Sequence, residues 1–89
     1  MTLSFPNRSR SFVGSRDSVR FWGYDGALEI SIFIDSAALQ VLVPAAIENE
    51  NGLIAAFDQA RERIYAAADR VYSRSPKGTF VIELYAKDI

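Results

Sequence analysis

A tight turn between two runs of alternating apolar residues constrains the fold of this chain more than any other feature. Asp25 and Gly26 both tolerate the positive φ angles of a type I′ turn, and alternating side chains flank them on both sides. The pair therefore predicts a β-hairpin over residues 19–34, in a register that places Tyr24 opposite Ala27.

The alternation gives this hairpin two unlike faces, because successive side chains of a strand point to opposite sides of the sheet. One face is apolar throughout and is expected to meet the core; it carries Val19, Phe21, Leu28, Ile30 and Ile32. The other face mixes aromatic rings with polar groups; it carries Arg20, Trp22, Tyr24, Ala27, Glu29 and Ser31, with Phe33 near its end. Arg20 and Glu29 lie diagonally across the pair, so we expect an ion pair between them.

Two helices and a strand are predicted after the hairpin. Asp35 is expected to cap a short helix that begins at Ser36 and that Pro44 ends. From about residue 51 to residue 73, apolar residues recur every three or four positions, which predicts one long amphipathic helix. Alternation over residues 79–85 then predicts a closing strand. Its inward side chains are expected to be Phe80, Ile82 and Leu84.

These elements indicate an α+β fold within a single domain, residues 1–89. We expect an antiparallel sheet made of the N-terminal segment, the hairpin and the C-terminal strand, with one short and one long helix packed on one face. A hydrophobic content of 49% is enough to fill such a core. Residues 1–16, which include a polar and basic stretch, are expected to form a partly extended arm.

The sequence contains neither histidine nor cysteine, which removes the side chains behind most nucleophilic, metal-binding and neutral-pH proton-transfer chemistry. Thiol redox switches and disulfide frameworks are excluded for the same reason. Asp58 and Glu62, one turn apart on the long helix, are interpreted as part of a solvated face and not as an acid–base pair. We therefore expect a protein that is not an enzyme and that uses no cofactor and no metal.

Charge and hydropathy point away from membranes and from bulk attraction to nucleic acid. Ten basic and eleven acidic residues give a net charge of -1. No run approaches the ~18 apolar residues of a membrane span, and no apolar signal-peptide segment opens the sequence, so we expect a cytoplasmic protein. The charges are unevenly placed: residues 1–24 are mainly basic and residues 25–58 are acidic, which indicates either an internal docking pair or a partner surface.

Three segments of the chain resemble one family of small bacterial proteins. They are residues 4–7 (SFPN), 19–29 (VRFWGYDGALE) and 57–64 (FDQARERI). The family is catalogued as domain of unknown function 1488, and the resemblance runs in order along nearly the whole chain. It implies a compact α+β domain in a bacterial cytoplasm. It implies no activity, and no position here inherits a catalytic or binding role from it.

The aromatic face of the hairpin is the strongest candidate for a functional surface. Aromatic rings and arginines are frequent energetic anchors of protein interfaces, so we expect a protein partner or a homodimer to meet this face. With the closing strand in the sheet, the candidate residues are Arg20, Trp22, Tyr24, Val81 and Tyr85. The alternative is that the chain's own leading segment covers the rings, through Leu3, Phe5, Phe12 and Val13.

A second hypothesis is weak binding of single-stranded nucleic acid. Arg8, Arg10 and Arg16 would neutralise phosphates while the nearby rings stack on bases. Against it stand the net charge near zero and the lack of a recognisable RNA-binding motif. A solvated N-terminal arm explains the same arginines, so nucleic acid is the less favoured partner.

Overall fold

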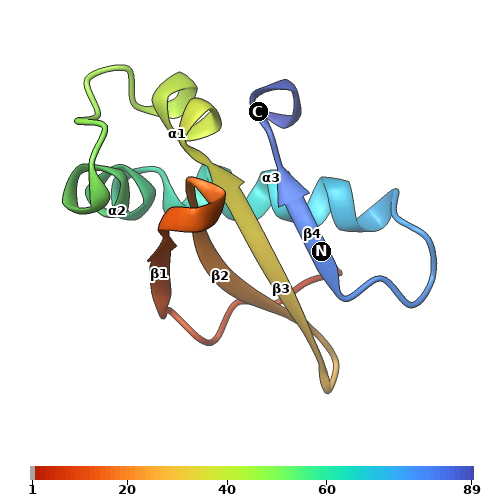
Figure 1. The fold of residues 1–89 in the computed structure, drawn as a ribbon. Coiled ribbons are helices and arrows are strands. Elements are labelled where there is room, and N and C mark those ends of the chain that lie inside the picture. The colour runs from red at the N-terminus through yellow and green to blue at the C-terminus, as the bar shows by residue number, and fades with distance from the viewer. Residues whose placement is uncertain (1) are drawn as a thin grey trace.

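The computed structural model describes residues 2–89 and shows one four-stranded sheet with the helices on one side (Figure 1). The strands lie in the order β1-β2-β3-β4, and the α+β class expected from the sequence is confirmed. In chain order the elements are β1 (Arg10–Val13), the short 3-10 turn η1 (Gly14–Arg16), β2 (Ser18–Asp25), β3 (Leu28–Asp35), α1 (Ser36–Leu42), α2 (Glu50–Gln59), α3 (Arg61–Ser73), β4 (Val81–Leu84) and the 3-10 turn η2 (Ala86–Asp88).

The predicted hairpin is present, but its loop lies one residue later than expected. Asp25 pairs with Leu28, so Gly26 and Ala27 form the loop. Only Gly26 has a positive φ in this loop (61°), which is the pattern of a type II′ turn with glycine first. The register therefore differs from the predicted one by two residues, with Phe21 opposite Ile32. Because side chains alternate with a period of two, both predicted faces are preserved.

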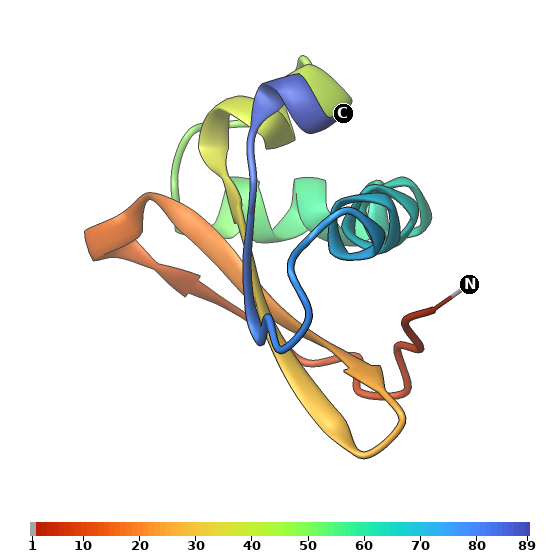
Figure 2. The same ribbon diagram turned by 90° about the vertical axis from the view of Figure 1, so that its right-hand side faces the viewer.

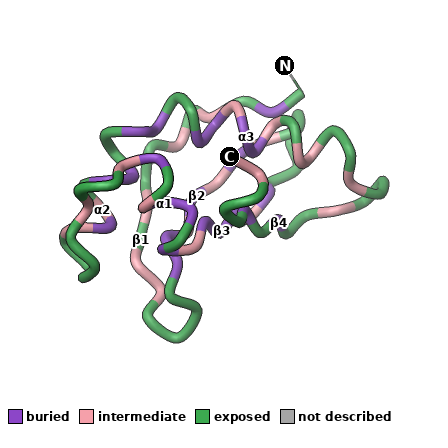
Figure 3. The backbone as a smooth tube through the Cα atoms, turned by 90° about the horizontal axis from the view of Figure 1, so that it is seen from above, coloured by how far each residue is buried: buried purple, intermediate pink, exposed green. Residues whose placement is uncertain are grey.

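The apolar face of the hairpin forms one wall of the core, as predicted. Phe21, Ile30 and Ile32 are buried against the apolar stripes of α2 and α3. Figure 3 shows the buried positions along the strands and along α3, where the two layers face each other. Leu28 differs: the hairpin tip extends past the helices (Figure 1), and this side chain is 44% exposed. Other core side chains are Val19, Ile34, Leu39, Leu53, Phe57, Ile64, Ile82 and Leu84.

The predicted long helix is in fact two helices, α2 and α3, separated by Ala60. The backbone at Ala60 leaves the α-helical region (φ −104°, ψ 16°). The apolar stripe nevertheless continues across the break, with Phe57 before it and Ile64 after it, so periodicity does not reveal it. With two shorter helices, α2 lies against β1 and β2 while α3 lies against β4, which lets the helix layer follow a twisted sheet.

Side-chain caps fix where α1 and α2 begin. Asp35 accepts a hydrogen bond from the amide of Ala38 (2.9 Å), as the sequence predicted. Asn49 accepts one from the amide of Gly52 (2.8 Å) at the start of α2. Each bond satisfies an amide that has no partner within the first helical turn.

Strand β4 runs parallel to β3, so the expectation of a wholly antiparallel sheet is wrong for this strand. The register pairs Ser31 with Val81. The connection from β3 to β4 contains all three α-helices, and such a crossover joins parallel strands. Ile82 and Leu84 are buried as predicted. Phe80 is not: it lies just before the first residue of β4 and is 62% exposed.

The leading segment, expected as a partly extended arm, is attached to the helix side of the sheet. Its first two described amides donate hydrogen bonds to the carboxylate of Asp69 (2.9 and 2.8 Å). Phe5 stacks on Tyr65 of α3, with ring centroids 4.0 Å apart. Gly23 on β2 leaves room for this packing, because a Cβ atom there would lie 2.9 Å from the ring of Phe5.

Candidate interaction surface on the sheet

The face of the sheet turned away from the helices, here called the outer face, is not covered by any other element of residues 2–89 (Figure 2). The alternative in which the leading segment covers its rings is wrong for three of the four residues involved. Leu3, Phe5 and Phe12 pack against the core on the helix side. Only Val13, on β1, is turned towards the outer face by the alternation of side chains along the strand. The outer face and its rim include Arg16, Arg20, Trp22, Tyr24, Glu29, Ser31, Phe33, Val81, Glu83 and Tyr85.

Arginines and aromatic rings alternate across the outer face. The guanidinium carbon of Arg16 lies 3.9 Å from the centroid of the Phe33 ring. The corresponding atom of Arg20 lies 5.6 Å from the same ring and 5.1 Å from the ring of Trp22. A cation above a ring is attracted by the ring quadrupole. The arginines thus shield these rings, and Phe33 is only 9% exposed although no backbone element lies over it.

Polar contacts on this face differ from the predicted ion pair between Arg20 and Glu29. Arg20 donates a hydrogen bond to the hydroxyl of Ser31 (2.9 Å), and the hydroxyl of Tyr24 donates one to Glu29 (2.8 Å). The two-residue shift in register explains the difference, because it places Glu29 opposite Tyr24 and Phe33 opposite Arg20. Glu29 is thereby moved away from the arginine.

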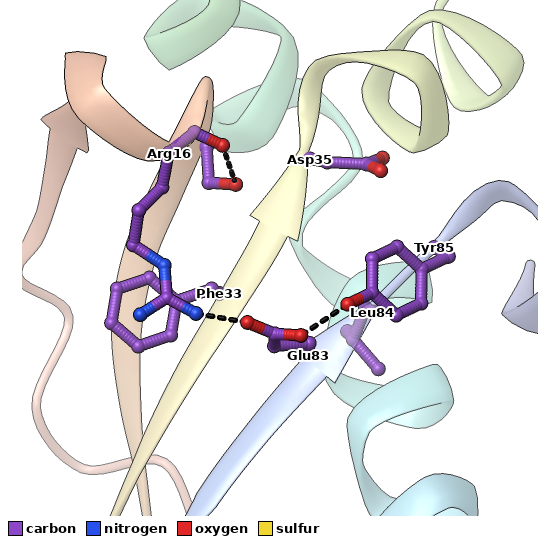
Figure 4. Close-up of a pocket in the computed structure, with 7 residues that line it drawn as sticks. Arg16, Phe33, Asp35, Glu83, Leu84 and Tyr85 are labelled. Atoms are coloured by element: carbon purple, nitrogen blue, oxygen red, sulfur yellow. Dashed lines mark hydrogen bonds and ion pairs between the residues drawn. The ribbon is translucent and has the colours of Figure 1, made fainter.

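A pocket of about 260 Å³ lies at one end of the outer face (Figure 4). Arg16 enters it from η1 and forms an ion pair with Glu83 of β4, whose carboxylate also accepts a hydrogen bond from the hydroxyl of Tyr85. That hydrogen bond and the nearby carboxylate charges raise the pKa of the Tyr85 hydroxyl above its ordinary value. The pocket is lined by Arg16, Ser18, Phe33, Asp35, Glu83, Leu84 and Tyr85.

The structure brings together the residues predicted for a protein interface: Arg20, Trp22, Tyr24, Val81 and Tyr85 all lie on the outer face or its rim. It separates the arginines predicted for nucleic acid. Arg16 lies on the outer face, but Arg10 lies on the helix side, paired with Asp58 (2.8 Å). Sequence reasoning missed Glu83 and Asp35 as pocket residues. Alternation along the closing strand placed Glu83 outward, but only the pairing of β4 with β3 brings it near Arg16.

Asp58 anchors the basic leading segment to the helices. Arg10 donates two hydrogen bonds to its carboxylate (2.9 and 2.8 Å), and the buried Arg61 donates a third (2.6 Å). Arg61 also donates to the hydroxyl of Tyr65 (2.8 Å). The hydrogen bonds from Arg10, followed by the one from Arg61, lower the pKa of Asp58. Part of the uneven charge in the sequence is therefore an internal docking pair.

Changing Asp58→Asn is expected to remove a stabilisation that depends on pH. The folded-state pKa of Asp58 lies below the unfolded value of about 3.9, so the contribution is complete above about pH 4 and is lost as pH falls through the folded-state value. With a side chain 40% exposed, its size is expected to be below about 1 kcal/mol. Thermal melts should show the wild type more stable at pH 6 and the difference shrinking towards pH 2.5; a constant difference would contradict this.

Over residues 2–89, no three side chains of the histidine, cysteine, aspartate or glutamate type gather where they would hold a metal ion. No helix in this range combines the length and the apolar character needed to cross a membrane.

Comparisons with known proteins agree with the resemblance found in the sequence. The family model for the protein of unknown function DUF1488 matches residues 3–84. The chain is also similar to the crystal structure of a protein of unknown function from the DUF1488 family of Shewanella loihica PV-4, with a TM-score of 0.77 and 17% identity over 93% of this chain and 91% of that one. At this identity the likeness between the structures shows the fold alone. No curated protein matches the chain. Because the family model covers nearly all of its residues, the chain belongs to the DUF1488 family.

Proposed function

We propose that this protein is a non-catalytic interaction module in which two copies associate through their outer faces. The observation that carries the proposal is a sheet face with Trp22, Tyr24 and two arginines that no other element of residues 2–89 covers. Tryptophan, tyrosine and arginine are the residue types most enriched among the energetic anchors of protein interfaces.

The charges of the outer face favour a second copy as the occupant. In a twofold dimer the same patch meets itself, so the patch must be complementary to itself. Two basic side chains, Arg16 and Arg20, stand beside the acidic Glu29 and Glu83, and Asp35 lines the pocket at the end of the face. A patch that carries both signs allows opposite charges to meet across a twofold axis, whereas a patch of one sign would repel its copy.

The same contacts count against single-stranded nucleic acid. Base stacking needs an open ring face, and the guanidinium groups of Arg16 and Arg20 already lie over Phe33 and Trp22. Two carboxylates on the face would repel phosphates. The ion pair between Arg10 and a helix carboxylate lies on the opposite side of the sheet.

Sedimentation velocity over a concentration series tests the proposal. We expect the wild type to dimerise with increasing concentration, and Trp22→Ala to weaken the dimer about 30-fold, which corresponds to about 2 kcal/mol in total for losing the Trp22 anchor from both copies. Val41→Ala, at a 54% exposed apolar position on α1, is the control and is expected to dimerise like the wild type. A wild type that remains monomeric at about 1 mM would overturn the proposal, as would an unchanged Trp22→Ala dimer.

A further inference from the structure

The pocket at the end of the outer face has the chemistry of an arginine-binding site. The ring of Phe33 provides a platform for a guanidinium group, and the carboxylate of Glu83 provides its counter-charge (Figure 4). The hydroxyl of Tyr85 donates to that carboxylate and so orients it. Within one chain, that chain's own Arg16 lies over Phe33 beside Glu83 and lines the pocket, and the open volume of about 260 Å³ next to it gives access to both groups.

The side chain of Arg16 is free to leave without disturbing the sheet. Arg16 ends η1, a turn of only three residues in the exposed loop that follows β1 and projects away from α3 (Figure 3). Its backbone is held in place, because the hydroxyl of Ser18 donates to its carbonyl oxygen (2.8 Å). Its side chain, in contrast, is 41% exposed, and that of Glu83 is 42% exposed. Both halves of the ion pair are therefore accessible from the outer face.

We infer that, in the dimer proposed above, Arg16 of each copy enters the Phe33–Glu83 pocket of the other copy. This inference rests on the proposed function. A twofold axis makes the exchange reciprocal, so the two ion pairs present within separate chains are replaced by two identical pairs between chains. The contacts that Arg16 makes between copies are the same as those it makes within one chain, as in domain swapping. Because η1 projects on the side where the second copy would approach, its arginine is positioned for the exchange (Figure 2).

Mixing two variants distinguishes exchange from pairing within one chain. Arg16→Ala retains the pocket but lacks the arginine, whereas Glu83→Gln retains the arginine but has a neutral pocket. Because the wild type has the Arg16–Glu83 pair both in the free chain and in the dimer, a variant that lacks the pair in both states is expected to dimerise about as tightly as the wild type. The mixed dimer gains one intact pair that neither free variant has, so an equimolar mixture is expected to associate about 10-fold more tightly than either variant alone. Sedimentation velocity with one variant carrying a fluorescent label measures this directly.

A second ion pair of similar exposure supplies the matched control. Arg10 and Asp58 are 36% and 40% exposed, and they lie on the helix side of the sheet. Arg10→Ala, Asp58→Asn and their mixture are expected to dimerise like the wild type. If the wild type dimerises but the Arg16→Ala and Glu83→Gln mixture gains nothing over its components, Arg16 pairs within its own chain and the inference is wrong while the proposed dimer stands. A monomeric wild type overturns both.

Discussion

Replacing Phe57 with alanine is expected to lower the free energy of unfolding by about 3–5 kcal/mol. Phe57 is fully buried on α2, and its ring centroid lies 5.0 Å from that of Phe21 on the sheet. The guanidinium carbon of the buried Arg61 lies 4.9 Å from the same ring. Truncation removes the contacts between the two layers and leaves a cavity that the sheet and helices cannot fully close. For a domain of this size, with a total stability of roughly 5–13 kcal/mol, the loss is a large fraction.

Phe80→Ala is the matched control, because it removes the same atoms from a position that is 62% exposed. Its effect is expected to stay within about 0.5 kcal/mol. Urea unfolding followed by circular dichroism and by the fluorescence of the single tryptophan, Trp22, measures both variants. Equal losses at the two positions would mean that Phe80 belongs to the core, as alternation along the closing strand had predicted.

The hairpin shows how far local sequence patterns determine this fold. Its turn was predicted one residue too early, yet the division into an apolar face and an aromatic face is correct. The reason is geometric: an even shift in register, from Phe21 opposite Ile30 to Phe21 opposite Ile32, turns no side chain over. The sheet face on which a side chain lies is thus predicted more reliably than the residue opposite it on the neighbouring strand. The predicted ion pair between Arg20 and Glu29 was wrong because it depended on the partner.

Features that depend on distant parts of the chain were not predictable from local patterns. The direction of β4 follows from a crossover through three helices, and the exposure of Phe80 depends on packing that alternation along the strand does not determine. The break at Ala60 is hidden because the apolar spacing is continuous across it. The leading segment meets the helix side because Phe5 stacks on Tyr65, sixty residues later in the chain.

Some features of the candidate surface likewise follow from local sequence patterns, and others follow from contacts between distant parts of the chain. Alternation alone placed Trp22 and Tyr24 on one face, and this placement is correct. The pocket, however, needs Arg16 from η1, Phe33 from β3 and Glu83 from β4. No spacing in the sequence relates these three residues, because the parallel pairing of β3 with β4 and the turn before β2 bring them together. A binding site of this kind becomes visible only once the strand order is known.

Replacing Gly52 with alanine is expected to destabilise the protein by about 2–3 kcal/mol, although alanine is the better helix former by about 1 kcal/mol. Gly52 lies in the first turn of α2, and a Cβ atom there would lie 2.0 Å from the carbonyl oxygen of Ile47. That oxygen belongs to the backbone, so relief requires the linker to move. The linker is held by the amide of Asn49, which donates to the same oxygen (2.9 Å), and by the Asn49 cap of the helix. Moving it therefore disrupts the start of α2.

Ala55→Gly tests whether the destabilising effect of alanine at position 52 comes from the close contact with the carbonyl oxygen of Ile47. Ala55 is exposed on the same helix, so glycine there is expected to cost about 1 kcal/mol through backbone entropy alone. Alanine should thus stabilise position 55 and destabilise position 52, within one helix and with the same pair of residues. Urea unfolding of both variants gives the two signs. If Gly52→Ala stabilises the protein, the linker does not press against α2, and the helix start is set by the Asn49 cap without any steric demand for glycine.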